Sequence, residues 1–360
     1  MKRFAFHTVA LLTLVACNEP TRPVAPRSPQ ADVAPASPQF TITDIGNLGG
    51  TFTQAFRINE EGHVIGGSTT ASGDLHAFLW TQGTGMIDLG TLPGSTSSLA
   101  WGINEQGVVV GEVDLPSGHP RAFVWTAAGG MRELGTLGGD AALAQGVNNQ
   151  GEVAGFSWVP SGIAHAVIWT AQGQIMDLGT FNGTNTHLRT LDDAGTTAAG
   201  SDNLRTDHPH AVLWKSATGF QDLGALGGDA DGSHAYHIND RGQVVGFSST
   251  GPGACCHAFF WTSATGMVDL GALNGTAGLS DAFDISNRGQ VTGSTTTPAD
   301  PNNSHAYVLT QTTGMQQLPD LPGEIDSGGL GINEAGQVIG FADTPDGRTH
   351  GILWTPIARP

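Results

Sequence analysis

The chain has 360 residues, of which 32 are acidic and 14 basic, so its formal net charge is −18 at pH 7. A surface of this sign does not attract nucleic acid or anionic lipid, which argues against a nucleic-acid partner. Glycine, at 53 residues, is about twice as frequent as in an average protein. Because most of these glycines recur at fixed offsets, they indicate regularly spaced turns.

The N-terminus predicts an export signal. Lys2 and Arg3 precede an apolar run over residues 9–16, which is too short to span a bilayer as a helix, and Cys17 follows directly. This arrangement resembles a bacterial lipoprotein signal, in which the cysteine is lipidated and becomes the first residue after cleavage. An ordinary signal peptide with a chance cysteine is the alternative. The resemblance, with Asn18 after the cysteine, favours the outer membrane over retention in the inner membrane.

Residues 18–39 are rich in proline and alanine and show no apolar periodicity. They predict a semi-extended spacer, which would reach about 70 Å as polyproline II. We therefore expect an exported protein, in the outer membrane or outside the cell, that touches the membrane only through its N-terminal lipid anchor.

After the spacer the sequence repeats. A five-residue stretch of the type His-Ala-Phe-Leu-Trp occurs seven times, at intervals of 44 to 48 residues. Its copies begin at His76, Arg121, His165, His210, His257, His305 and His350. A fixed period of this size is typical of solenoids and β-propellers.

One repeat unit predicts four short strands and no helix. Its first strand covers residues 54–58, and its second strand, residues 63–68, follows a turn that starts with Asn and ends with Gly. The third strand is the repeated stretch, residues 76–80, and the fourth is residues 86–90. Four strands in about 45 residues match the size of a propeller blade.

The two ends of the repeat region complement each other. Residues 40–46 form a fourth strand without a third strand before it, and residues 350–354 form a third strand without a fourth after it. In a propeller these two strands would pair and close the ring, whereas an open solenoid would need polar capping units. The chain is thus predicted to be all-β, a seven-bladed β-propeller of four-stranded blades. Its expected segments are a lipoprotein signal peptide over 1–17, a linker over 18–39 and the propeller over 40–356.

The repeated motifs resemble the HAF family of extracellular bacterial repeat proteins. They are His-Ala-Phe followed by Trp, Met-x-Asp-Leu-Gly, Leu-Gly-Gly and Ile-Asn-x-x-Gly-x-Val-x-Gly, and they cover the chain after residue 40. The resemblance implies an exported bacterial protein and carries no activity with it. The sixth unit departs from the pattern, because Leu309 replaces Trp and Gln317-Leu318-Pro319 replaces Asp-Leu-Gly.

The repeated histidines could suggest a metal ring, but their spacing argues against it. Equivalent third-strand positions in a ring of seven would lie roughly 14 Å apart, too far to share one ion. Each histidine is therefore expected to bond within its own blade. The tryptophans that end the third strands are expected to pack between blades.

Function is expected where the repeat is broken. Counting back four residues from the end of each first strand gives equivalent positions on the central channel, where three consecutive units carry His187, His234 and Asp281. Neighbours there would lie roughly 6–8 Å apart, close enough for a divalent metal such as calcium or zinc, or for a proton-transfer pair. A wet channel lined by polar residues is the alternative. A second polar group is expected towards the other end: His237, Asp284 and Arg57.

Two further features are candidates. Trp158 stands in a predicted loop, where it could stack on a sugar or peptide or simply anchor the loop. The adjacent Cys255 and Cys256 could form a strained vicinal disulfide in an exported protein, or remain two packed thiols. The loops between units vary in length and carry many aspartates, and variable loops on a rigid scaffold are a common place for binding.

No nucleophile elbow, phosphate loop, zinc-protease helix or dinucleotide fingerprint occurs in the sequence. We therefore expect a monomeric, non-enzymatic, lipid-anchored binding module that uses the loop face of a propeller. Carbohydrate, peptide or a surface protein would be its partner. A metal-dependent hydrolase or lyase with a site at the channel mouth, and a structural adhesion protein, are the alternatives.

Overall fold

The computed structural model describes residues 39–183, 185–195, 197–202, 209–228, 231–251 and 256–357. These residues belong to one compact unit, built of strands with a single short 3-10 helix, η1 (Gly275–Ala277). Within them, no helix has the length and apolarity needed to cross a membrane. The predicted signal peptide, Cys17 and the predicted linker up to residue 38 lie outside the described residues.

Six repeat units fold into four consecutive strands, as their pattern predicts, and the seventh consists of three consecutive strands and β1. The first strands, called the inner strands below, are β2 (Gly49–Ile58), β6 (Ser97–Ile103), β10 (Ala142–Val147), β14 (Thr186–Leu191), β18 (Ser233–Ile238), β22 (Ser280–Ile285) and β26 (Asp326–Ile332). The second strands are β3 (Val64–Thr70), β7 (Val109–Asp114), β11 (Val153–Trp158), β15 (Thr197–Asp202), β19 (Val244–Ser249), β23 (Val291–Thr295) and β27 (Val338–Asp343). The third strands are β4 (Leu75–Thr81), β8 (Pro120–Thr126), β12 (Ala164–Trp169), β16 (His210–Lys215), β20 (Cys256–Thr262), β24 (His305–Thr310) and β28 (Thr349–Pro356). The fourth strands are β5 (Gly85–Asp88), β9 (Gly130–Glu133), β13 (Ile175–Gly179), β17 (Gly219–Asp222), β21 (Gly266–Gly271), β25 (Gly314–Gln317) and β1 (Phe40–Asp44).

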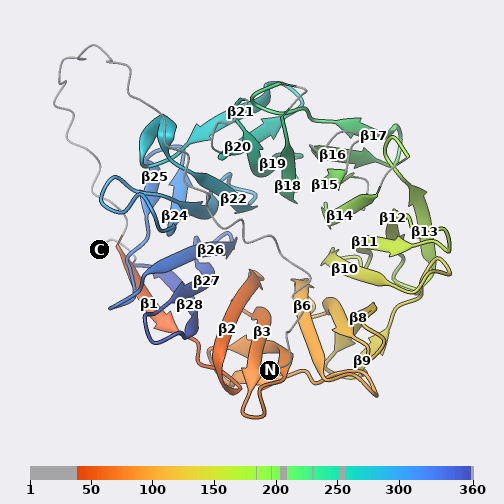
Figure 1. The fold of residues 1–360 in the computed structure, drawn as a ribbon. Helices are drawn as coiled ribbons and strands as arrows, with labels where there is room; N and C mark the ends of the chain where they lie inside the picture. The colour runs from red at the N-terminus through yellow and green to blue at the C-terminus, as the bar shows by residue number, and fades with distance from the viewer. Residues whose placement is uncertain are drawn as a thin grey trace. The chain divides into compact units, whose positions relative to one another are not determined.

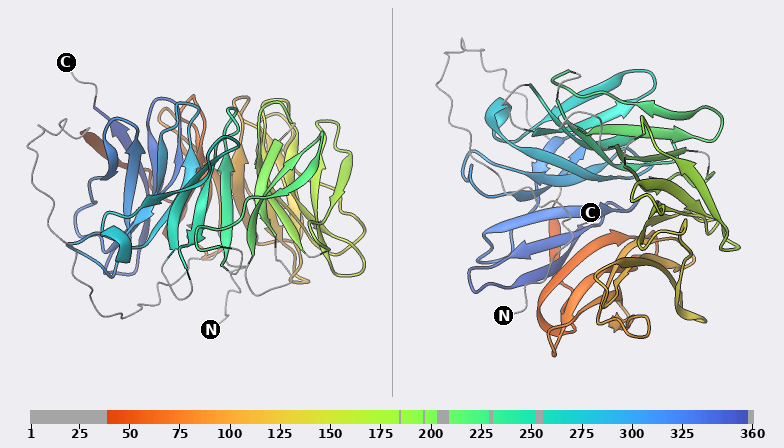
Figure 2. Two further views of the ribbon diagram at one scale, coloured as in Figure 1. Left: turned by 90° about the horizontal axis from the view of Figure 1, so that it is seen from above. Right: turned by 45° about the vertical axis from the view of Figure 1, so that its right-hand side comes forward.

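The sheets stand around a common centre with the inner strands nearest to it, which is the arrangement of a β-propeller (Figure 1). Five sheets contain four antiparallel strands each, and a sixth contains eight. The eight-stranded sheet consists of two sets of four, joined by one parallel pair between Phe52 and Thr349. Seen edge-on, the sheets stand side by side (Figure 2).

The N-terminal strand β1 pairs with β28 near the other end of the chain. The pairing is antiparallel over five residues, from Phe40 opposite Pro356 to Asp44 opposite Ile352. The side chains of Phe40 and Ile42 pack against the buried cluster that contains Trp354. Residues 40–46 therefore take the place of a fourth strand beside the last third strand.

Every inner strand contains a β-bulge, which the sequence analysis did not foresee. In each, the register with the second strand shifts by one residue and leaves that residue without a partner in the ladder. The bulged residues are Phe56, Trp101, Gln145, Arg189, Tyr236, Phe283 and Leu330. Bulges bend a strand and redirect its side chains, and these seven occupy one level of the ring.

The repeated glycine of the second strand is required by close packing. A Cβ atom on Gly66 would lie 2.0 Å from the carbonyl oxygen of Gln54 and 2.9 Å from the ring of Phe78. Phe78 comes from the repeated third strand and is fully buried. The Gly of Val-x-Gly and the Phe of His-Ala-Phe thus form one packing unit, in which no side chain larger than hydrogen fits beside the ring.

The first residue of the repeated stretch bonds within its own sheet, as predicted. In five units the histidine Nδ1 lies 2.8 to 3.0 Å from an aspartate carboxylate of the fourth strand. The pairs are His76–Asp88, His165–Asp177, His210–Asp222, His257–Asp269 and His350–Asp44. Arg121 and Glu133 replace this pair in the second unit, with Nε 3.1 Å from Oε1.

Hydrogen bonds between the turns connect neighbouring units at the end of the inner strands, here called the turn end. In each unit the residue after the turn Asn, or its counterpart, donates its backbone N–H to the side chain of the same residue in the next unit. The donors and acceptors run Glu60 to Glu105, Glu105 to Asn149, Asn149 to Asp193, Asp193 to Asp240, Asp240 to Asn287, Asn287 to Glu334 and Glu334 to Glu60. This turn circuit of seven bonds returns to the residue at which it began.

A second set of bonds lies inside the turn circuit. Asn104 is 4% exposed, its Oδ1 accepts the N–H of Val108 in its own turn, and its Nδ2 donates to the carbonyl oxygen of Asn148 in the next unit. One buried side chain therefore shapes the turn and joins two units.

We predict that Asn104→Ala lowers the free energy of unfolding by about 1–3 kcal/mol, because it leaves buried backbone groups unpaired. Asn104→Asp should also destabilise the protein, because a buried carboxylate oxygen would face the carbonyl oxygen of Asn148. Chemical denaturation measures both, with Gln106→Ala on the exposed side of the same turn as the control. Equal stability of Asn104→Ala and the control would contradict the assignment.

Candidate functional site

The most polar region near the centre comes from three consecutive inner strands, β14, β18 and β22. They carry His187 and Arg189, His234 and Tyr236, and Asp281 respectively. All five side chains are half-buried, in contrast to the fully buried positions between them. We call these five residues the polar cluster. Its two histidines and Asp281 lie towards the start of the inner strands, here called the loop end.

At the level of the bulges, β2, β6, β22 and β26 bring apolar side chains, whereas β10 brings Gln145. The rings of Phe56 and Trp101 lie 4.5 Å apart, and both pack in one cluster with Leu330 and Phe283. Beside them Glu112 is 7% exposed and accepts a hydrogen bond of 3.3 Å from Trp101 Nε1, while burial raises its pKa to about 8. The centre is therefore two-sided, with aromatic packing on one side and the polar cluster on the other.

His187 is held as a neutral imidazole. It stacks on Phe156 of the preceding unit at 4.1 Å between ring centroids. Burial, and secondarily the charge of Arg189, lowers its pKa to about 4. Its Nε2 is buried and has no hydrogen-bond partner among the described residues. A neutral ring nitrogen of this kind can donate to or accept from a ligand.

His234 lies one unit further on and stacks within its own sheet, on the residue opposite it in β19. Its ring stacks on Phe247 at 4.9 Å. Burial lowers its pKa to about 4, and the charge of Arg189 and the nearby His187 add to the effect. Both imidazoles are therefore uncharged at neutral pH and offer hydrogen bonds without charge.

Arg189 is the bulged residue between the two histidines. Its guanidinium carbon lies 5.1 Å from the centroid of the Tyr236 ring, a cation–π contact, and Tyr236 in turn packs on Phe283. Burial lowers the pKa of Arg189, and its Nε is buried with no partner in the described part of the chain. A guanidinium cannot lose its proton in a protein, so this donor remains available.

Asp281 contributes a carboxyl group that is only partly ionised near neutrality. Burial raises its pKa to about 7, against a hydrogen bond from Ser294 that lowers it. No cation pairs with it among the described residues. Asp281 can thus act as donor or acceptor, depending on its partner.

The predicted metal site is not assembled by this structure. Among the described residues, one group of three His, Cys, Asp or Glu side chains has all its potential ligand atoms within 4.8 Å of one another, and it lies elsewhere, in the sixth unit. His187, His234 and Asp281 do not form such a group. Their sequence equivalence was counted correctly, but equivalent positions on neighbouring strands point their ligand atoms too far apart to share an ion.

The second predicted polar group is brought together at the turn end. His237 Nδ1 lies 2.8 Å from Asp284 Oδ1, and Arg57 lies 3.9 Å from the other carboxylate oxygen. Burial opposes ionisation of Asp284, but the charges of His237 and Arg57 outweigh it and lower its pKa to about 2. Arg57 also donates to the carbonyl oxygen of Leu330, and Asp284 accepts from the N–H of Ile332. These bonds join four inner strands, so this group serves the fold.

Trp158 does not stand in a loop. It ends strand β11 opposite Ala164 and is half-buried against Leu143 and Phe156, because the strand continues two residues further than its apolar pattern suggests. The centroid of its ring lies 5.4 Å from that of the Phe156 ring, on which the His187 ring stacks. Trp158 therefore borders the polar cluster, as a packed side chain and not as an exposed platform.

The described residues include one of the two adjacent cysteines. Cys256 begins strand β20, opposite Ser249, whereas Cys255 lies outside them. The vicinal disulfide stays a prediction.

Sequence reasoning missed Arg189, Tyr236 and Phe156. The first two are bulged residues, and counting with the two-residue period of a regular strand assigns them to the wrong face. Phe156 lies on a second strand, where it reads as ordinary core. Arg189 is the one charged residue among the seven bulged residues, and this was the available signal.

No protein-family model matches the chain, and no curated protein matches it. Several solved structures resemble it. A puromycin-hydrolyzing peptidase from Mycobacterium tuberculosis aligns with a TM-score of 0.57 and 12% identity, over 91% of this chain and 55% of that one. A puromycin hydrolase aligns with a TM-score of 0.57 and 12% identity, over 84% and 52%. TolB from Acinetobacter baumannii aligns with a TM-score of 0.49 and 10% identity, over 82% and 67%.

At these identities the likeness to the two hydrolases concerns the fold alone and supports the propeller arrangement. The chain spans about half the length of either hydrolase.

We predict that Asp281→Asn stabilises the protein above pH 7 by on the order of 1–2 kcal/mol. The folded carboxyl keeps its proton up to about pH 7, whereas the unfolded one loses it near pH 3.9, so stability falls as pH rises between these values. The full shift would correspond to about 4 kcal/mol, and partial exposure reduces it. Asparagine removes this cost, and the difference should vanish below pH 4.

Urea denaturation between pH 4 and pH 8 measures the effect. Asp284→Asn, three residues along the same strand, is the matched control and should behave oppositely. Its pKa is lowered to about 2, so the wild-type carboxylate stabilises the fold above pH 4 and loses that contribution as the pH falls towards 2. A destabilising Asp281→Asn at pH 8 would be inconsistent with the described environment.

Proposed function

We propose that the chain is an exported, lipid-anchored binding module, a closed seven-bladed β-propeller of HAF-type repeats that binds its ligand at the loop end of the polar cluster. The observation that carries the proposal is the pair of buried, unpartnered nitrogens, His187 Nε2 and Arg189 Nε. Buried polar atoms in proteins almost always have partners, so two on one strand indicate a ligand that supplies them. Export and lipidation rest on the N-terminal sequence with Cys17.

Support for seven blades comes from the bonding between units. The turn circuit contains seven bonds and ends where it starts. The eight-stranded sheet counts as two blades, because one parallel residue pair joins its halves. The pair His350–Asp44 repeats, between β28 and β1, the contact that third and fourth strands make in other units.

Deletion of residues 40–46 tests ring closure. Without β1 the buried Trp354, 1% exposed, loses part of its cover, and the last sheet loses its outer strand. We expect a loss of several kcal/mol, roughly 10 °C in Tm, and a broadened transition in calorimetry. Deletion of seven residues from the linker, 31–37, is the control of equal length. Identical melting of both deletions would count against closure by β1.

A carbohydrate suits the polar cluster best. Sugars combine apolar ring faces with several hydroxyl groups that both donate and accept. The site offers two neutral imidazoles, one guanidinium and a carboxyl group that titrates near neutrality, with the half-buried ring of Trp158 at its border. Such mixed surfaces of aromatic rings and converging polar groups are typical of small-ligand sites. Peptides and surface proteins are the other partners that the fold would admit.

Glycan-array binding and calorimetry with cell-wall oligosaccharides test this function on the full chain. We expect Arg189→Met to weaken binding by about 10- to 100-fold, the value of a hydrogen bond to a charged group. Gln145→Met, at the bulge of β10 outside the polar cluster, is the matched control and should bind normally. Binding that is lost equally in both variants, or no binding across the panel, would refute a carbohydrate site here.

A further inference from the structure

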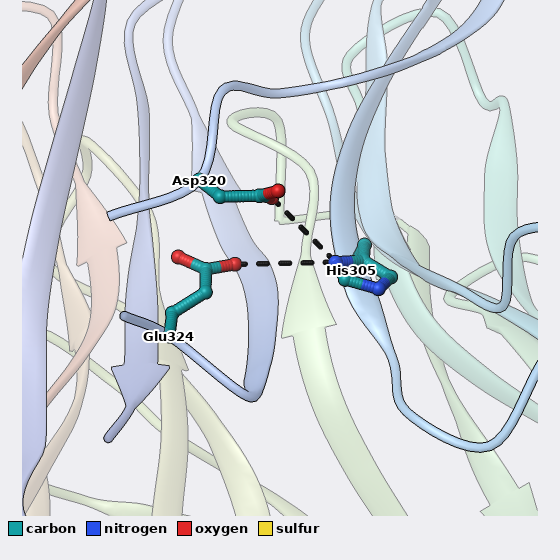
Figure 3. A group of neighbouring side chains, drawn as sticks. All are labelled: His305, Asp320 and Glu324. Atoms are coloured by element: carbon teal, nitrogen blue, oxygen red, sulfur yellow. Dashed lines mark ion pairs between the residues drawn. The ribbon is translucent and has the colours of Figure 1, made fainter. Parts of the chain in front are cut away.

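The sixth unit lacks the aspartate that its histidine should meet. In the first unit Asp88 lies opposite Phe78 in the sheet, and the equivalent place opposite Tyr307 is taken by Gln317. His305 therefore has no carboxylate from its fourth strand. Two acidic residues in the segment after that strand, Asp320 and Glu324, approach the imidazole instead (Figure 3).

The three side chains converge on one point, and His305 makes no hydrogen bond to either acid there. His305 Nδ1 lies 3.5 Å from Asp320 Oδ1 and 4.0 Å from Glu324 Oε1. The regular pairs have 2.8 to 3.0 Å at this position, so the sixth unit does not rebuild the bond with other residues. Ligand atoms around a tetrahedral ion with bonds of about 2.0–2.2 Å lie roughly 3.4 Å apart, and all the potential ligand atoms here lie within 4.8 Å.

Burial makes this spacing significant. His305 is 8% exposed, and both of its ring nitrogens lack a hydrogen-bond partner among the described residues. The Glu324 side chain is 2% exposed, and its Oε1 likewise has no partner there. A buried imidazole and a buried carboxylate oxygen that face each other without a bond are costly unless something between them satisfies both.

Neighbouring groups hold the carboxylates in place. Glu324 Oε2 accepts the backbone N–H of Leu321 at 2.6 Å, which leaves Oε1 directed at His305. Gln317 donates from Nε2 to Asp320 Oδ1 at 2.8 Å. Gln317, which stands where other units have the aspartate, thus positions Asp320.

We propose that His305, Asp320 and Glu324 bind a divalent transition-metal ion, zinc in preference to calcium or magnesium. One imidazole and two carboxylates are a zinc donor set, whereas calcium requires six to eight oxygen ligands and magnesium an octahedral oxygen shell. Asp320 is exposed, so the ion can enter from solvent and take water as a further ligand. Asp300 lies 3.8 Å from His305 Nε2, on the side from which a carboxylate commonly orients a metal-binding imidazole.

The ion would tie the segment after β25 to strand β24. In the other units a direct bond between His and Asp or between Arg and Glu makes this connection. The site is therefore a metal-dependent version of a contact that the repeat otherwise builds from protein atoms. It is independent of the polar cluster and of the binding function proposed above.

Titration calorimetry of the full chain, stripped with a chelator, tests the proposal with zinc, calcium and magnesium chlorides. We expect one tight zinc site, a rise in Tm with zinc, and neither effect with calcium or magnesium at equal concentration. Cobalt(II) should give the intense visible absorption of a tetrahedral site with nitrogen and oxygen ligands.

Glu324→Gln, which preserves shape, should weaken zinc binding at least ~10-fold while keeping the metal-free Tm within a few degrees. His165→Gln, which breaks a regular histidine–aspartate pair, is the matched control and should keep the zinc affinity of the wild type. Zinc binding that is absent from the wild type would mean an ion pair only, between a protonated His305 and its acids. Zinc binding that survives Glu324→Gln, or that calcium matches, would equally overturn the proposal.

Discussion

The turn circuit is the constraint on which the rest of the structure depends. Each bond joins a backbone N–H to a side chain of the next unit, and five of the seven acceptors are carboxylates. Carboxylates accept stronger hydrogen bonds than amides do. Partial burial raises the pKa of Glu60 and of Glu105, and the hydrogen bonds that their carboxylates accept offset this cost of burial. Because the circuit fixes the end of every inner strand, equivalent residues in different units stand at equivalent levels around the centre.

A scaffold so regular makes its irregularities informative. Repeated positions have a folding role that their neighbours reveal, such as the glycine under Phe78 or the aspartate beside His76. Two places break the rule without an evident gain in packing. The polar cluster gathers polar residues on three consecutive inner strands, and the sixth unit exchanges a direct bond for Asp320 and Glu324. Both places leave buried polar atoms unpartnered, which a purely structural role does not require.

Much of this architecture can be predicted from the sequence, since turn chemistry and strand period are local properties. The strands follow from the Asn-to-Gly turns and the alternating pattern, and the pairing of residues 40–46 with the last strand follows from the unmatched ends. The bulges are not predictable in this way. A bulge adds one residue, such as Arg189, inside the strand, and the apolar residues at the strand ends, from which the strand is recognised, stay the same. The group around His305 was also missed, because it depends on how a segment without repeated sequence folds back over β24.

Two aspartates three residues apart on β22 show why geometry decides function here. Asp284 is reached by Arg57 and His237 from other strands, and its pKa is lowered to about 2. Among the described residues no such cation reaches Asp281, and burial raises its pKa to about 7. The residue type, the strand and the sheet are the same. The difference between the two pKa values therefore arises from the side chains of neighbouring inner strands that lie beside each carboxylate. Asp284 is therefore committed to holding strands together, whereas Asp281 retains a proton that it can share with a ligand at the loop end.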